Sequence, residues 1–261
     1  MSQALTRDWP AWLRWWPIWR RHFLAWRRYW LSSLMFAVVE PLLYMLGLGY
    51  GLGALVPELG GMSYLLFVAS GTLAFSIVNA ASFEAMYSAF ARMQVQRTWD
   101  AILNAPLELR DVLLAEWLFA ASKSALSCVA FVGALLLLGV SREATLVLVL
   151  PASALIGLAF AALALIMTAL AKGYEFFAYW FSLGLMPLAM LSGVFFPMSQ
   201  LPPALEQISW YLPMSHAVEL IRPLVRGALP AYWVLHVAVL ALYAVAGFAL
   251  AYALVKRRFV H

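Results

Sequence analysis

The sequence predicts an all-α polytopic membrane protein with six transmembrane helices, and three observations support this fold class. The first is composition: 65% of the 261 residues are hydrophobic and only 11% are charged, which is not the balance of an ordinary soluble domain. The second is a series of six apolar runs, each at least about 20 residues long, which is the length a helix needs to cross the hydrocarbon core. The third is one internal charged stretch, residues 90–111. The chain therefore has to be read as a series of membrane crossings with one large polar interruption.

The apolar runs give approximate positions for the transmembrane helices. They form one transmembrane domain, residues 31–261, with helices expected at 31–53, 63–90, 112–139, 144–171, 174–196 and 231–255. Six crossings place both termini on the same side of the membrane. The net charge of +5 is then explained by membrane topology and by contact with anionic lipid, and it gives no support to nucleic-acid binding.

The distribution of lysine and arginine indicates which side the termini occupy. Six of these residues lie before the first run, three between the second and third, one between the fourth and fifth, and three after the sixth. The opposite connections hold only Arg142, Arg222 and Arg226. By the positive-inside rule, both termini and residues 90–111 are cytoplasmic.

Residues 1–30 have the pattern of an amphipathic helix at the membrane interface. Aromatic residues recur every three or four positions, while arginines occupy the opposite face. Pro17 is expected to kink this helix or to start it afresh. The pattern fits an aromatic anchor for the first span or a mobile gate equally well. The residues of interest are Trp16, Trp19, Arg20, Arg21 and Trp26.

Residues 90–111 predict a second, shorter amphipathic helix. Val95, Trp99 and Ile102 recur at helical spacing, Thr98 stands at an N-cap position, and Asp100 falls in the favoured first turn. A short amphipathic helix between two membrane spans has a shape suited to docking into another protein.

Residues 197–228, between the fifth and sixth runs, are rich in proline and contain two weakly amphipathic pieces. They predict a pair of short helices dipping back from the outer face, the second capped by Ser215 and ended by Gly227. A surface loop with two helical turns is the alternative.

Four ionisable residues fall inside the predicted spans: Glu40, Glu84, Glu116 and Lys123. An ionised group at the membrane centre costs about 2.5 to 3.5 kcal/mol, so such groups usually face one another or a watery cavity. Glu116 and Lys123 share a helix face, and Glu84 reaches the same side if the second and third spans form a hairpin. A structural ion-pair network is favoured, with a role in the substrate path as the alternative. Glu40 precedes Pro41 and marks either a hinge or a bent packing element.

The sequence lacks the motifs of several enzyme classes. It has no P-loop, no metalloprotease or serine-hydrolase signature, and one cysteine, Cys128. The four histidines are scattered and are expected at interfaces or in packing. An enzyme is therefore not predicted, and neither a cofactor nor a metal is expected in this chain.

Four segments resemble the ABC-2 type permeases, and within that family the permeases of nodulation-factor (lipo-chitooligosaccharide) exporters in particular. They are WRRHFLAWRR, FARMQVQRTWDAIL, LSGVFFPMSQLP and LPMSHAVELIRP, and the likeness extends over essentially the whole chain. The family also includes the permeases of O-antigen, teichoic-acid and daunorubicin-type exporters.

The resemblance implies a transport subunit of the bacterial cytoplasmic (inner) membrane. Such a subunit forms a homodimer, recruits two copies of a P-loop ATPase that holds ATP and magnesium, and exports a lipid-linked oligosaccharide. The resemblance assigns an interface or gate helix to residues 1–30, a coupling helix to residues 92–105 and re-entrant helices to residues 197–227. The residues expected to couple to the ATPase are Arg92, Gln96, Arg97, Trp99 and Asp100.

Two alternatives stay open from the sequence. One is a related permease with a drug, haem or polysaccharide as cargo. The other is an ATP-independent secondary transporter, against which stand the absence of an inverted repeat and the small number of intramembrane charges.

Overall fold

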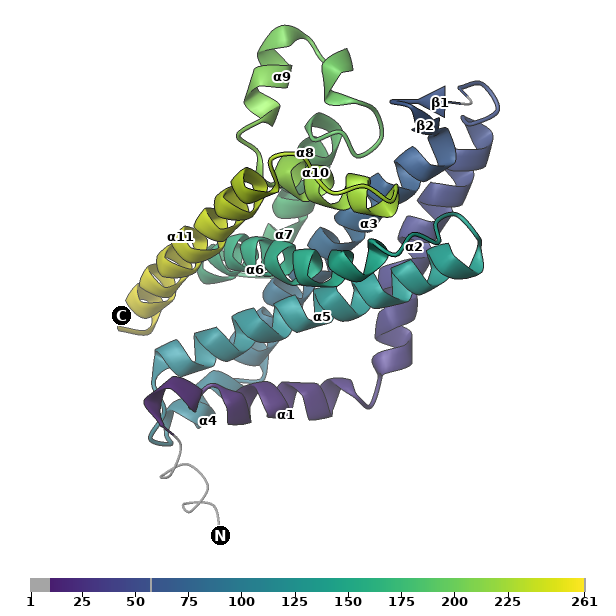
Figure 1. Cartoon of the computed structure of the whole chain (residues 1–261). Coiled ribbons are helices and arrows are strands. Elements are labelled where there is room, and N and C mark those ends of the chain that lie inside the picture. The colour runs from purple at the N-terminus through teal and green to yellow at the C-terminus, as the bar shows by residue number, and fades with distance from the viewer. Residues whose placement is uncertain (1–9, 57, 261) are drawn as a thin grey trace.

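The computed structural model describes residues 10–56 and 58–260, and in them the chain is a bundle of long helices (Figure 1). Five of the described helices are long and apolar enough to cross a membrane. They are α2 (Trp30–Gly51), the continuous helix Tyr64–Val95, α5 (Leu109–Leu137), α6 (Leu146–Leu170) and α11 (Trp233–Val260). The membrane character predicted from composition is therefore matched by helices of spanning length.

The second of these helices is unusually long and is built from three parts. α3 (Tyr64–Phe83) continues through two wider, π-helical segments, η2 (Glu84–Ser88) and η3 (Ala91–Val95). Its 32 residues extend about 48 Å at 1.5 Å per residue, well beyond the roughly 30 Å of the hydrocarbon core. At least one end of this helix must therefore lie outside the hydrocarbon, in the headgroup layer or in water.

The predicted fifth span, residues 174–196, forms a shorter helix than expected. Its apolar helix, Phe176–Leu191, has 16 residues and extends about 24 Å. It consists of α7 (Phe176–Tyr179), the π-helical η4 (Trp180–Leu185) and α8 (Met186–Leu191). The apolar run overestimated the helix because its last residues form a turn, in which Gly193 has a φ of 75°. That left-handed conformation suits glycine and ends the helix.

The two ends of the bundle differ in their short elements (Figure 1). One end carries a β-hairpin and the short helices that follow Leu191, and residues of both line one pocket. The other end carries α1, α4 and the C-terminus, where Trp99 of α4 stacks on Phe259 of α11. The short elements are η1 (Ala11–Leu13), α1 (Trp16–Trp26), β1 (Glu58–Leu59), β2 (Met62–Ser63), α4 (Thr98–Leu103), η5 (Met198–Gln200), α9 (Pro203–Ser209) and α10 (Pro213–Val225).

Two helices, α9 and α10, lie within residues 197–228, where a helix pair was expected. Gly227 follows α10 with a φ of 89°, so its predicted role at the helix end is confirmed. The prediction for Ser215 is wrong: α10 begins at Pro213, and Ser215 is a buried residue inside it. Proline at a first helical position has a suitable φ, so the helix starts earlier than the serine suggested.

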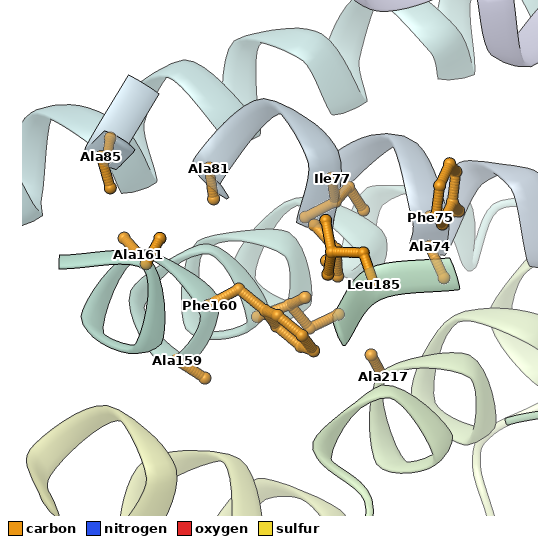
Figure 2. Packing of buried hydrophobic residues seen from close by; sticks show 14 of the residues in the cluster. Ala74, Phe75, Ile77, Ala81, Ala85, Ala159, Phe160, Ala161, Leu185 and Ala217 are labelled. Carbon is orange, nitrogen blue, oxygen red and sulfur yellow. The ribbon is translucent and has the colours of Figure 1, made fainter. Parts of the chain in front are cut away.

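The hydrophobic core is centred on α3, which packs against α2, α5, α6 and α10. Figure 2 shows small side chains of α3, including Ala74 and Ala81, facing Phe160 and Ala161 of α6 and Leu185 of the following helix. Small residues at such contacts let helix backbones approach closely, which is how helices associate in a membrane.

One backbone approach is close enough to require glycine. A Cβ atom added at Gly71 of α3 would lie 2.0 Å from the carbonyl oxygen of Val194. We expect Gly71→Ala to lower the free energy of unfolding by about 1–3 kcal/mol, because backbone atoms would have to move. The measurement is the thermal melting of the purified protein. The matched control is Gly133→Ala in α5, where the added Cβ meets nothing within 4 Å and helix propensity predicts a gain of up to about 1 kcal/mol.

Candidate functional site

Three of the four intramembrane ionisable residues predicted from the sequence come together in one buried cluster. Glu84 is the first residue of η2, while Glu116 and Lys123 belong to α5. Lys123 Nζ donates to Glu84 Oε2 at 2.7 Å, and Ser88 Oγ donates to the same oxygen at 2.9 Å. The expected hairpin of spans and an ion pair across it are therefore present. Glu40, by contrast, lies on the exposed face of α2.

Arg92 completes the cluster and joins its two carboxylates. Its Nε donates to both oxygens of Glu116, at 2.9 and 3.1 Å, and its Nη2 donates to Glu84 Oε1 at 2.8 Å. Glu116 is 0% exposed and the Arg92 side chain 13%. Two carboxylates thus face two cations, so the cluster is balanced in charge and each ion is hydrogen bonded, as burial in a low dielectric requires.

The coupling helix predicted from the sequence is attached to this cluster. Trp99 of α4 is 0% exposed, and its Nε1 donates to Glu116 Oε1 at 3.0 Å. Thr98 Oγ1 donates to the carbonyl oxygen of Arg92 at 2.9 Å. Thr98 is the first residue of α4 rather than its N-cap, so that prediction is wrong. The hydroxyl holds α4 to the end of the preceding helix instead.

The N-terminal helix α1 reaches the same carboxylate. His22 Nε2 lies 3.2 Å from Glu116 Oε1, and the Trp19 indole donates to Ser122 Oγ of α5 at 3.2 Å. From its own position on α5, Glu116 therefore contacts residues of α1, η3 and α4. Glu116 is thus a single side chain through which α4 is connected to three other helices.

The five residues expected to couple to a partner divide into two groups. Arg92 and Trp99 point into the cluster, whereas Gln96, Arg97 and Asp100 are exposed. Arg97 has a φ of 48°, a left-handed conformation that turns the chain sharply from the long helix into α4. Gln96, Arg97 and Asp100 together form an exposed bend, which we call the coupling surface after the role that the sequence predicts for it.

The interface helix shows the predicted separation of faces in part. Arg20 and Arg21 are exposed, and Trp26 is buried against the bundle. Trp16 is exposed and stacks on Trp19 at a ring distance of 4.9 Å. Pro17 is the second residue of α1, so the prediction that it begins the helix afresh is confirmed. Residues 1–9, which were also assigned to this helix, lie outside the described part of the chain.

Two residues of the cluster were not assigned to it from the sequence. The sequence predicts His22 at an interface or in packing, and its spacing of four from Ile18 and from Trp26 places it on the buried face of α1. Arg92 was assigned to the partner contact because the π-helical turns, which carry its side chain to Glu84, have no clear sequence signal. Among residues 10–56 and 58–260, no three His, Cys, Asp or Glu side chains come close enough to hold a metal ion.

Tyr29, which follows α1, is also affected by the charge of the cluster. Tyr29 stands at the junction with α2, and partial burial together with the negative charge of Glu84 raises the pKa of its hydroxyl. The phenol therefore stays protonated and able to donate a hydrogen bond over the whole physiological range.

Comparison with known proteins agrees with this architecture. The family described as "ABC-2 type transporter" matches residues 14–225. The chain is 41% identical over 228 residues to Nodulation protein J of Rhizobium meliloti (strain 1021), covering 87% of each chain. It is 42% identical over 228 residues to Nodulation protein J of Rhizobium leguminosarum bv. trifolii, again covering 87% of each. The chain therefore belongs to the ABC-2 type transporter family, and it is a membrane permease similar to Nodulation protein J.

Proposed function

We propose that the chain is the transmembrane subunit of an ABC exporter that moves an amphiphilic, lipid-linked oligosaccharide out across the bacterial cytoplasmic membrane. A separate P-loop ATPase, present in two copies and holding ATP and magnesium, supplies the energy. The observation that carries the proposal is the attachment of α4 to the buried cluster through Trp99 and Glu116. A partner pressing on the coupling surface would transmit force directly to helices of the membrane bundle.

The proposed topology places the coupling surface and both termini in the cytoplasm. The excess of Lys and Arg in the connections on that side supports it. So does the position of α4 beside the last turn of α11. The sixth crossing would be the short helix Phe176–Leu191 with its apolar flanks.

The outer helices α9 and α10 would dip into the membrane on the opposite side. Arg222 of α10 supports this, because it donates to Ser70 Oγ of α3 at 3.1 Å and to the carbonyl oxygen of Gly193 at 2.6 Å. Irregular backbone at membrane depth is tolerated only where protein covers it, and these hydrogen bonds hold α10 against the bundle.

The active form would be a homodimer, and the exposed face of α2 supports this. That face is mostly apolar, and Glu40 is its only charged residue among those that line an open groove of about 940 Å³ together with Leu31, Val39 and Leu43. A carboxylate facing lipid is costly. A second copy placed against α2 would cover the apolar face and enclose Glu40 in a polar path between the protomers.

The cargo assignment rests on the relatives and on the chemistry of α1. The similar proteins are named for nodulation, and nodulation factors are lipo-chitooligosaccharides. Exposed tryptophans and arginines on α1, such as Trp16 and Arg20, suit a cargo with a sugar head and an acyl chain still in lipid.

Purification and reconstitution test the proposal. The tagged chain, isolated from the membranes of its native host, should bring with it a stoichiometric P-loop ATPase. Proteoliposomes holding both should export a labelled lipo-chitooligosaccharide only when ATP is supplied. Transport at full rate by the chain alone, without ATP, would instead identify a secondary transporter. Stimulation of the ATPase by drugs and not by lipid-linked oligosaccharides would identify a drug as the cargo.

A further inference from the structure

A cavity lined by both polar and apolar side chains lies beside the charged cluster. The cavity has a volume of about 310 Å³ and is enclosed by the junction of α1 with α2, by α3 and by α5. Lys123 lines it at one side. Its volume is at the lower end of the range found for small-molecule sites. It is therefore large enough for one compact polar group.

Several polar groups that line the cavity lack partners. The Asn79 side-chain amide and the hydroxyls of Ser32 and Ser33 form no hydrogen bond with any other described residue, although all three line the cavity. The indole nitrogen of Trp26, which also lines it, is buried without a partner in the same part of the chain. Asn79 and Ser33 are half-buried and Ser32 is exposed, so the buried indole is the group whose missing hydrogen bond is costly. A polar ligand in the cavity would accept a hydrogen bond from the indole and meet the three polar side chains beside it.

The charges around the cavity favour a neutral ligand over an anionic one. Lys123 is the only cation among the lining residues, and its ammonium lies 2.7 Å from Glu84 Oε2. Because Arg92 and Glu116 also pair with each other, the cluster offers no excess positive charge. A phosphate would therefore have to be desolvated without an opposite charge to compensate it.

The remaining lining residues suit a sugar ring. Trp26 and Tyr29 present aromatic surface to the cavity, and a pyranose has C–H faces that pack on aromatic rings and an edge of hydroxyls that hydrogen bond. The amide of Asn79 can donate and accept at that edge. Tyr29 and Phe83 are exposed, so the cavity can be reached from outside the bundle.

We propose that this cavity binds one neutral sugar unit of the exported glycolipid before transport. This inference rests on the proposed function and adds to it a specific site within one protomer. Occupation of the site would bring the sugar against Lys123, and so next to the cluster that carries the coupling helix. Binding of the cargo would then affect the same charged cluster that, in the proposed function, is displaced by the ATPase.

Cysteine labelling in membrane vesicles tests the site. The full chain is produced with its ATPase partner, the buried Cys128 is replaced by alanine, and Ser33→Cys is the reporter. Chitotetraose is the neutral probe, and inorganic phosphate at equal concentration is the anionic one. We expect chitotetraose to slow the reaction of the thiol with N-ethylmaleimide at least fivefold and phosphate to leave it unchanged. Asn79→Leu, added to the reporter chain, should abolish this protection. Ser199→Cys, on the exposed η5, is the control and should react equally fast with and without sugar.

The outcomes separate the inference from the proposed function. Protection by phosphate alone, protection by neither probe, or protection that survives Asn79→Leu in a chain with unchanged melting temperature would each overturn the sugar site. ATP-dependent export of lipo-chitooligosaccharide is measured separately in vesicles carrying the wild-type chain. Export without protection of the reporter would refute the sugar site but would still support the proposed function. Absence of export removes the proposed function whatever the labelling shows.

Discussion

Replacing Arg92 and Glu116 together by methionine is expected to cost less stability than replacing either residue alone. Breaking a buried ion pair by removing one partner costs about 3–5 kcal/mol, because the other charge is left uncompensated, whereas removing both can be nearly neutral. In the double variant, Glu84 keeps Lys123 at 2.7 Å and Ser88 at 2.9 Å, so the remaining charges stay balanced. The measurement is the free energy of unfolding of the four proteins in mixed detergent micelles.

The double-mutant cycle isolates the interaction between the two side chains. Arg110→Met and Glu58→Met remove one exposed cation and one exposed carboxylate, and each is expected to change stability by no more than about 0.5 kcal/mol. Strict additivity of the Arg92 and Glu116 effects would contradict a coupled pair. The cluster would then consist of independently solvated groups.

The helical plan of the chain could be predicted from the sequence because apolar runs and turn residues carry strong local signals. Gly227 at the end of α10 and Pro17 at the start of α1 are examples, since each acts through its own backbone. The length of the helix Phe176–Leu191 could not be predicted in the same way. Its flanking turn is as apolar as the helix, and composition does not separate the two.

Residues of the candidate site could be predicted only where their positions on one helix face showed that they lie close together. Glu116 and Lys123 are seven residues apart on α5, and Glu84 follows from the hairpin of spans. The contact of His22 with Glu116 depends on how far α1 lies along α5, which no local pattern reports. The apolar face of residues 90–111 was expected to dock into a partner, yet Trp99 packs inside its own chain, while Val95 is 64% exposed.

The burial of Trp99 changes what its removal would test. Truncation of a large buried aromatic costs about 3–5 kcal/mol, so Trp99→Ala is expected to destabilise the chain as well as disturb coupling. Trp99→Phe would keep most of the packing and lose the hydrogen bond to Glu116. Asp100, which is exposed on the next position, gives a cleaner test of contact with a partner.

Asp100→Arg is expected to lower ATP-driven export at least tenfold, equivalent to about 1.4 kcal/mol of lost coupling, while the chain still inserts and folds. Asp100 forms no salt bridge within the described residues, so the substitution breaks no internal ion pair. The loss of a carboxylate from the first turn of α4 costs at most about 1 kcal/mol. A large effect on export would therefore support the proposed contact of the coupling surface with an ATPase.

Export and ATP hydrolysis are measured together in proteoliposomes that hold the ATPase partner. In the Asp100→Arg variant, we expect hydrolysis to continue without matching export, because the partner still binds nucleotide but no longer moves α4. Glu58→Arg is the matched control, since it reverses an exposed charge on the β-hairpin at the opposite end of the bundle and should leave export unchanged. Normal export by Asp100→Arg would place the contact elsewhere. If both variants lost export equally, the cause would be the change in net charge. A specific contact at α4 would instead make only Asp100→Arg lose export.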